Sequence, residues 1–438
     1  MQAPLTSSIK SNNFLRKLRK VFLVLIATVS VTAVTKIASG ADGDVLSLSQ
    51  AEMMALSNDT GTKQARARQE SFKEQAVAAN TWPDPKLNLG LANLPVNSFE
   101  IDQEPMTQTV IGISQMFPPW GAVGAKSDQL QDMSDSMSHA ARNQRLMTLA
   151  GVRKSWLDVY FQHQAIRLVK ENLDVFGQFI DVTKFQYRAG RGNQQDVIRA
   201  QLEQNLLQDR LAETQAKYEI SVAALTKWLG IERLSSQLDM QFPQLPKLPE
   251  SQQIVADLER HPTVMMRKLR VNSAENGVNY ANSQRRPGWA LMVQYGLRAD
   301  DPSGMTRDDF LTAMLTFDLP LFTGNRQDRM VAASKSDVVA TQQDLDDWRR
   351  EIRMRFEKSL AVYTRTNERV QLYDGSVLPH SQQNTEATLK AYQSGVTDFN
   401  VLVRARLTEL KSQLQYVKLN VERAKAQVEL LYFAGVDN

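Results

Sequence analysis

The sequence lacks cysteine and has few histidines. Of its 438 residues none is Cys, and the four histidines are His139, His163, His261 and His380. Without thiols the chain cannot form disulfides, thiolate metal sites or an N-terminal lipid attachment at Cys. The histidines form neither an HExxH motif nor an i,i+4 pair, so we expect no catalytic or tight transition-metal site.

The signatures of common enzymes are also missing. The sequence contains no P-loop, no GxSxG motif and no GxGxxG motif between a strand and a helix. Met53-Met54 and Met265-Met266 offer soft thioether ligands for copper, but both pairs lie in expected amphipathic helices, where Met usually fills the core. We therefore expect a protein that is not an enzyme, holds no metal and needs no cofactor.

Only one long apolar run occurs, and it lies near the beginning of the chain. Val21 to Val34 follows five basic residues, Lys10, Arg16, Lys17, Arg19 and Lys20, and small residues come after it. This layout predicts a signal peptide over residues 1–40, cleaved near Ala38-Ser39-Gly40 or one residue later, because the run is short of the roughly 20 residues of a spanning helix. An uncleaved anchor helix is the alternative.

Residues 41–438 lack both a spanning helix and a basic character. They contain no stretch of 18 apolar residues, so a membrane span in this part would have to be a closed barrel. The formal net charge of +4 includes the six basic residues of segment 1–40, which has no acidic residue, so about −2 remains. We therefore expect no nucleic-acid partner.

The second half of the sequence repeats the first. Tyr187-Arg-Ala-Gly190 matches Tyr392-Gln-Ser-Gly395 at an offset of 205 residues, which also places Gly230 on Gly435. Further matches in the same order make duplication the better interpretation. We assign residues 41–245 to the first structural repeat and 246–438 to the second.

Each half predicts a helix followed by two strands. The opening helical stretches, Ser49 to Thr81 and Ser251 to Gln284, end at proline-containing segments. The expected strands are 84–95 and 106–117 in the first half, and 288–298 and 308–319 in the second. Apolar side chains alternate along them, which suits a lipid-facing wall, although two hairpins packed on a soluble core would alternate in the same way.

Two long helical hairpins follow the strands. Gly121 to Arg188 has no proline, and Gly324 to Tyr392 has only Pro379, so each predicts a helix of roughly 100 Å. They turn at tips near residues 188–193 and 393–398 into return helices of about 37 residues. An opening helix of about 33 residues stacked end to end on a return helix matches the length of the long helix.

These elements cannot close around a pore within one chain. A sheet of four strands keeps two exposed edges, which lipid does not tolerate. Three copies would supply 12 strands, an even number within the known range, so we expect a homotrimer. The predicted fold class is mostly α with a small β part, in which long helical hairpins form a tunnel and four strands contribute to a 12-stranded transmembrane β-barrel.

The chain resembles the TolC-type outer-membrane efflux channel family over essentially all of residues 41–438. The resemblance rests on the two halves, the strand-to-helix junctions and the second tip turn, namely Phe117-Pro118-Pro119-Trp120-Gly121, Leu319-Pro320-Leu321-Phe322-Thr323-Gly324, Tyr392 to Gly395 and Val401-Leu402-Val403-Arg404-Ala405. It implies a channel set in outer-membrane lipid and extending into the periplasm, where it docks to a periplasmic adaptor and an inner-membrane pump of the RND type.

Three segments are most similar to the heavy-metal branch of that family, which serves cation-exporting pumps. They are Trp82-Pro83-Asp84-Pro85, Asp102-Gln103-Glu104-Pro105-Met106 and Gln115-Met116-Phe117-Pro118. The resemblance thus implies heavy-metal cations as cargo. Alternatives are a multidrug or type I secretion channel, a periplasmic helical scaffold, or an adaptor, although an adaptor would carry one hairpin rather than two.

The tips are the candidate site for gating and adaptor contact. The candidate residues are Tyr187, Gly190, Asp196, Arg199, Tyr392, Gly395, Asp398 and Arg404. Many family members carry acidic residues where this chain has Val401 and Arg404, whereas the first repeat has Asp196 and Arg199 at the equivalent positions. The chain thus departs from the ring of acidic residues that the resemblance implies, and any gate here would be a ring of mixed charge. The alternatives are solvated charges on ordinary helical turns, with Asp398 capping the return helix.

Overall fold

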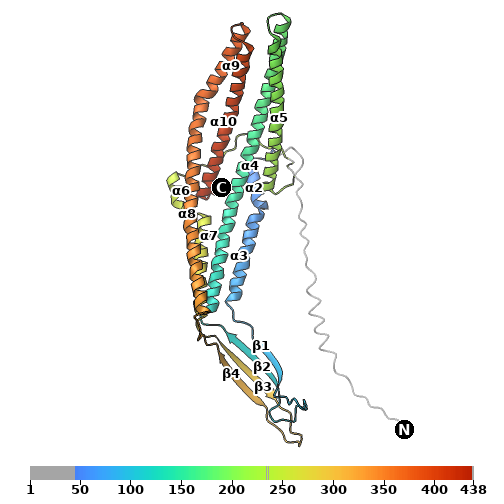
Figure 1. The fold of residues 1–438 in the computed structure, drawn as a ribbon, viewed down its shortest axis with the longest axis vertical. Coiled ribbons are helices and arrows are strands. Elements are labelled where there is room, and N and C mark those ends of the chain that lie inside the picture. The colour runs from blue at the N-terminus through green and yellow to red at the C-terminus, as the bar shows by residue number, and fades with distance from the viewer. Residues whose placement is uncertain (1–44, 233, 235, 437–438) are drawn as a thin grey trace, which may run out of the picture. The chain divides into compact units, whose positions relative to one another are not determined.

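The computed structural model describes residues 45–436 apart from 233 and 235. The predicted signal peptide and its cleavage site lie outside the described residues. The described part forms one compact unit that consists of long helices and a four-stranded sheet (Figure 1). Among its residues, no helix is both long enough and apolar enough to cross a membrane.

In the first half, three shorter helices lie along one long helix. α4 runs from Ala122–Arg188 and contacts α2 (Leu48–Asn58), α3 (Thr60–Ala79) and α5 (Gln194–Leu229). α4 has 67 residues, which agrees with the predicted length of roughly 100 Å, and α5 has 36. α2 and α3 cover the part of α4 that lies nearer the sheet, and α5 covers the rest (Figure 1). The predicted end-to-end arrangement is thus confirmed.

The second half repeats this arrangement with more interruptions. It contains α6 (Ser251–Asp257), a 3-10 turn (Leu258–Arg260), α7 (Pro262–Ser283), α8 (Gln327–Leu372), a π-helical turn (Tyr373–Val377), α9 (Leu378–Gln393) and α10 (Phe399–Ala434). Pro379 lies in the first turn of α9, directly after the π-helical turn. Because proline cannot donate a backbone hydrogen bond and crowds the preceding turn, a widened turn is a physical solution at this position.

The prediction of one uninterrupted opening helix in each half is wrong. In the first half, Asp59 has extended backbone angles, ends α2, and accepts hydrogen bonds from the N–H groups of Gly61 and Thr62 at 2.9 and 3.2 Å. In the second half, His261 is extended because the following Pro262 disfavours a helical conformation before it. The cap formed by Asp59 and the proline at 262 therefore divide helical stretches that the composition predicted to be continuous.

Replacement of Asp59 by alanine should destabilise the helical part. The carboxylate of Asp59 is buried, caps α3 and also accepts a hydrogen bond from Thr148 of α4 at 3.0 Å. Loss of the cap and an unsatisfied Thr148 hydroxyl should together cost about 1–3 kcal/mol of unfolding free energy. Thermal unfolding followed by circular dichroism should show the effect. Asp59→Asn retains a cap acceptor and should fall close to the wild type, and equal midpoints for both variants would contradict the capping role.

The break at His261 is held by a buried polar network. The imidazole Nδ1 lies 2.8 Å from Thr263 Oγ1 and Nε2 lies 3.2 Å from the carbonyl oxygen of Tyr432. Trp348 Nε1 donates to the same Thr263 hydroxyl at 2.9 Å. The pKa of His261 is lowered to about 4, mainly by burial and also by the nearby charge of Arg142, while the bond to the backbone of Tyr432 opposes the shift. The folded chain therefore holds this side chain neutral.

Acid should destabilise the folded protein as the pH falls from 6.5 towards 4, because protonation of His261 is unfavourable in the folded state. Because the folded-state pKa lies below the ordinary value of 6.5, the stabilisation is complete above pH 6.5 and is lost as the pH falls towards 4. Up to about 3 kcal/mol should be lost. Thermal midpoints measured between pH 7 and 4 should fall in the wild type and fall less in His261→Gln. A parallel decline in both proteins would rule out this cause.

The four strands form one antiparallel sheet in the order β1-β2-β3-β4. They are β1 (Lys86–Ala92), β2 (Gln108–Phe117), β3 (Trp289–Leu297) and β4 (Phe310–Phe317), and each lies within its predicted range. β2 pairs with β3 from Thr109 opposite Leu297 to Phe117 opposite Trp289, which joins the two halves of the sequence. The outer edges of β1 and β4 have no partner strand among the described residues.

One side of this sheet is a continuous apolar surface, called here the apolar face. The register places Ile113 opposite Val293, and Val293 opposite Ala313. The large side chains of the apolar face are between 38% and 72% exposed, and they are Leu87, Leu89, Leu91, Ile111, Ile113, Trp289, Leu291, Val293, Tyr295, Leu297, Leu311, Leu315 and Phe317. The other side alternates with it and is mixed, with polar and small residues such as Asn88, Gly112 and Thr312 and apolar ones such as Met116 and Met314.

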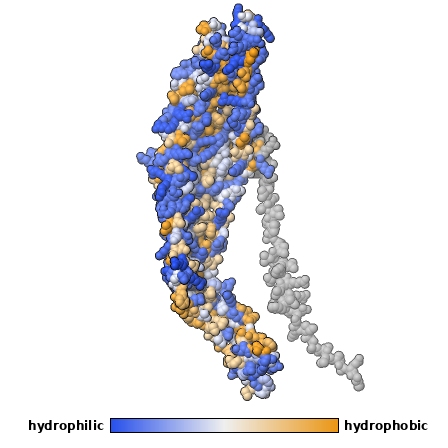
Figure 2. Space-filling view, viewed as in Figure 1, coloured by the Kyte–Doolittle hydropathy of each residue, from blue (hydrophilic) through white to orange (hydrophobic). Residues whose placement is uncertain are grey.

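No described helix packs across the apolar face. The strands make their extensive contacts with one another. Hydrophobic residues gather over the sheet in the space-filling view, whereas hydrophilic residues dominate this view of the helices (Figure 2). The alternative of two hairpins packed on a soluble core is therefore wrong for the described residues.

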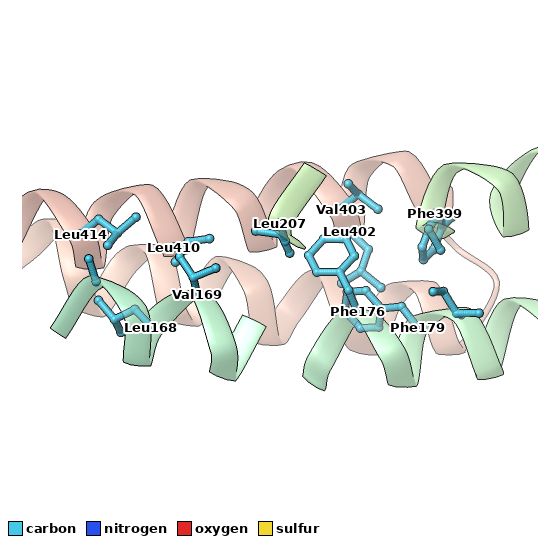
Figure 3. Packing of buried hydrophobic residues seen from close by; sticks show 13 residues of the cluster. Leu168, Val169, Phe176, Phe179, Leu207, Phe399, Leu402, Val403, Leu410 and Leu414 are labelled. Atoms are coloured by element: carbon cyan, nitrogen blue, oxygen red, sulfur yellow. The ribbon is translucent and has the colours of Figure 1, made fainter. Parts of the chain in front are cut away.

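The main core near the tips joins the two helical hairpins. Phe176 of α4, Phe399 of α10 and Leu402 of α10 are at most 1% exposed, and they pack in one cluster with Ala200 and Leu207 of α5. Figure 3 shows the side chains of Phe176, Leu207 and Leu402 pointing between the helices. Three further clusters bury the contacts of the long helices nearer the middle of the unit. Burial of large apolar side chains is the main stabilising contribution to such a bundle.

Candidate functional site

The two tip turns share one backbone conformation. Residues 189–193 join α4 to α5, and residues 394–398 join α9 to α10. Gly190 and Gly395 have positive φ angles of 69° and 74°, and each N–H donates to the carbonyl of Tyr187 or Tyr392 at 3.0 Å. Only glycine adopts this conformation without strain, so both glycines are explained by the turn itself.

The eight predicted site residues all lie at or near these turns. Tyr187, Gly190 and Arg199 are exposed in the first repeat, as are Gly395, Asp398 and Arg404 in the second, whereas Asp196 and Tyr392 are half-buried. Sequence reasoning paired residues across the repeats by alignment. The structure places five of the eight near one another in two groups, and it leaves Tyr187, Gly190 and Gly395 outside both.

The first group consists of Asp196, Asp398 and Tyr392. Burial raises the pKa of Asp196, a bond from the backbone of Asn193 opposes the shift, and the charge of Asp398 raises it further. Burial also raises the pKa of Tyr392, and the charge of Asp196 adds to that shift. The two tip turns thus approach closely enough for carboxylates of different repeats to repel each other.

Asp398 does not have the predicted capping role. It occupies the N-cap position of α10 with an extended backbone, but its side chain accepts no capping hydrogen bond. Its backbone carbonyl accepts the N–H of Val401 at 3.1 Å instead. The carboxylate therefore remains exposed near Asp196.

The second group contains Arg199 and Arg404. Both line a groove of about 470 Å³ between α5 and α10, together with Asn400 and Lys411. Arg199 also forms an ion pair with the buried carboxylate of Glu203 at 2.7 Å. Sequence reasoning missed Lys411, although its distance of seven residues from Arg404 was a signal that could have identified it.

The described residues offer no metal-binding cluster. No group of three or more His, Cys, Asp or Glu side chains among them could hold a metal ion. Met54 packs against a buried cluster, as predicted, but the prediction that Met53 fills the core is wrong because its side chain is 65% exposed. Both residues of the other pair, Met265 and Met266, are half-buried.

The repeat, the sheet and the tips agree with a match to one protein family. Residues 53–231 and 254–436 each match the family described as outer membrane efflux protein. The chain belongs to this family. The two matches of the family to one chain also agree with the internal repeat, whose glycines with positive φ recur as Gly190 and Gly395 and again as Gly230 and Gly435.

Solved structures of outer-membrane channels have the same fold as this outer membrane efflux protein. The outer-membrane channel OprN is 16% identical, with 89% of each chain covered and a TM-score of 0.75. CusC, described in connection with transmembrane channel formation, is 16% identical, with 88% of this chain and 91% of that chain covered and a TM-score of 0.74. The CmeC outer membrane channel of Campylobacter jejuni is 13% identical, with 89% and 85% covered and a TM-score of 0.75. No curated protein matches the chain.

Proposed function

We propose that this protein is the outer-membrane channel of a tripartite efflux system. Three copies form a barrel from twelve strands and a tunnel from their helices. A periplasmic adaptor and an inner-membrane pump of the RND type deliver the cargo, and the channel conducts it passively to the outside. The protein itself catalyses no reaction.

The apolar face of the sheet is the observation that carries this proposal. Its large apolar side chains are exposed on all four strands, whereas the opposite side mixes polar and small residues with a few apolar ones, among them Met116, Met292 and Met314. A sheet that faces lipid on one side and water on the other has this pattern. The unpaired edges of β1 and β4 would pair with neighbouring copies, because an open edge in lipid leaves backbone groups without hydrogen-bond partners.

The helical end supports the contact with a periplasmic partner. Both tip turns lie at the end of the unit opposite the sheet (Figure 1). With the sheet in the outer membrane, the long helices would carry the tips deep into the periplasm. We propose that Tyr187, Asp196, Tyr392 and Asp398 act at this entrance, as part of the gate or of the adaptor contact.

Heavy-metal cations are the proposed cargo, on the basis of the segments shared with the heavy-metal branch. Deletion of the protein should lower tolerance to at least one of copper, silver, zinc, cobalt, nickel and cadmium. Unchanged tolerance to all six would favour the multidrug or type I secretion alternative.

Cell fractionation tests the channel proposal. The full chain, expressed in a bacterium with an outer membrane, should fractionate with that membrane and migrate as a trimer in a gel under mild conditions. Recovery as a soluble monomer would contradict the proposal, and it would favour a helical scaffold.

A further inference from the structure

A furrow runs along the surface between α5 and α10, starting near the tips. It consists of the groove of about 470 Å³ at Arg199 and Arg404 and a second groove of about 510 Å³. Lys411 lines both, so the two grooves are adjacent along α10. The accessible apolar floor is formed by two half-buried side chains, Phe161 of α4 in the second groove and Leu407 of α10 in the first, above the buried Val169. A groove between helices with an apolar floor can accept a further helix.

Both rims of this furrow are basic. Exposed cations line it from α5 and from α10, and they are Arg199, Arg210, Lys217, Arg404, Lys411 and Lys418. We call this surface the basic furrow.

The cations are spaced by heptads. Arg404, Lys411 and Lys418 follow one another at intervals of seven residues on α10, and Arg210 and Lys217 do so on α5. Seven residues are two helical turns, so each row stays on one side of its helix. Charges at this spacing beside an apolar seam determine partner choice in coiled coils. A small anion would instead require donors that converge on one point.

Acidic residues near the furrow pair with three of its six cations. Glu203 pairs with Arg199 at 2.7 Å, Glu213 with Lys217 at 2.5 Å, and Glu422 with Lys418 at 3.8 Å. Within the described part of the chain, Arg404 and Lys411 form no ion pair. The charges of Arg404 and Lys411, on the part of the α10 rim nearer the tips, are therefore available to an acidic partner.

We propose that the basic furrow binds an α-helix of a partner protein that carries Asp or Glu at heptad spacing beside an apolar seam. Its apolar residues pack on the furrow floor, and its carboxylates meet the two rows of cations. The inference rests on the proposed function, because it names the chemistry of the partner that meets the helical end of the channel.

Two synthetic helical peptides of about three heptads test this proposal. Both have Leu at the seam, and the flanking positions are Glu in one peptide and Lys in the other. The purified full chain should bind the Glu peptide in a fluorescence anisotropy titration and should not bind the Lys peptide. Added salt should weaken the interaction because it screens exposed charges.

Charge reversal on the α10 rim should reverse this preference. The triple variant Arg404→Glu, Lys411→Glu, Lys418→Glu should bind the Glu peptide at least about tenfold more weakly and should now bind the Lys peptide. The matched control reverses three exposed cations of α8, Lys335→Glu, Lys358→Glu and Arg365→Glu, and should bind like the wild type. If the triple variant fails to fold, Lys411→Glu alone provides the comparison.

Equal binding of both peptides would overturn the proposal. Binding of neither would also overturn it, and this is the result expected if a second copy of the chain covers the furrow. Conductance of the wild type in planar bilayers separates this outcome from failure of the proposed function. Selective peptide binding without conductance would contradict the proposed channel function and support the proposed binding of an acidic helix. Conductance without selective binding would support the channel function and contradict the binding of an acidic helix.

Discussion

Replacement of Val293 by arginine is expected to remove most of the protein from the outer membrane. Val293 lies on the apolar face near the middle of β3, with Ile113 and Ala313 directly opposite on the neighbouring strands. An arginine facing lipid at the bilayer centre costs about 2–4 kcal/mol in each copy. Folded protein in the outer-membrane fraction, measured by its mobility shift on heating, should fall strongly.

Gln294→Arg is the matched control for this experiment. Gln294 is the next residue in β3 and points to the opposite side of the sheet, where the proposed trimer would hold water. It should assemble at a level close to the wild type. Equal loss of both variants would indicate general damage to the strand, and normal assembly of Val293→Arg would show that this side of the sheet does not face lipid.

Replacement of Phe176 by alanine is expected to loosen the helical hairpins near the tips. Its side chain is fully buried, and its ring lies 5.4 Å from that of Phe179 in an edge-on contact. Truncation of such a side chain costs about 3–5 kcal/mol. Hydrogen exchange should therefore become faster in α4, α5 and α10 near the tips, while the sheet remains unchanged.

Phe185→Ala provides the control for the core prediction. Phe185 lies nine residues further along the same helix, but its side chain is 69% exposed. Its truncation should leave exchange in the helices almost unchanged. If Phe185→Ala loosened the tips as much as Phe176→Ala, the assignment of the core to the interior of the hairpins would be wrong.

The sequence was informative where one periodic pattern extended over a long segment. The absence of proline between Gly121 and Arg188 predicts α4, and alternating apolar residues identify the faces of β3 and β4. These signals are local and repeated many times, so single exceptions do not obscure them. Because the sequence repeats, each element predicted in one half supported the prediction of the same element in the other half.

The breaks and the tip contacts were harder to predict for physical reasons. Asp59 ends a helix because its carboxylate caps the next one and also meets Thr148, a contact between residues 89 positions apart. Asp196 and Asp398 approach each other only because two separate hairpins pack together through the cluster around Phe176 and Phe399. Such pairings depend on tertiary structure and have no local sequence signature.

The duplication produces two similar backbones with different chemistry at their ends. Both turns have glycine at positive φ, but Asp196 of the first repeat corresponds to Val401 of the second. A trimer would therefore have six similar tips with two alternating sets of side chains. The charges of the basic furrow and the carboxylates of the tips lie on this asymmetric part of the chain.

Single-channel conductance of the purified protein in a planar lipid bilayer tests the central claim most directly. The account predicts discrete, stable conductance steps from the trimer, which disappear when Val293→Arg prevents assembly and persist in Gln294→Arg. A correctly folded trimer that inserts into the bilayer without conducting, or a protein that remains monomeric and does not insert, would contradict it.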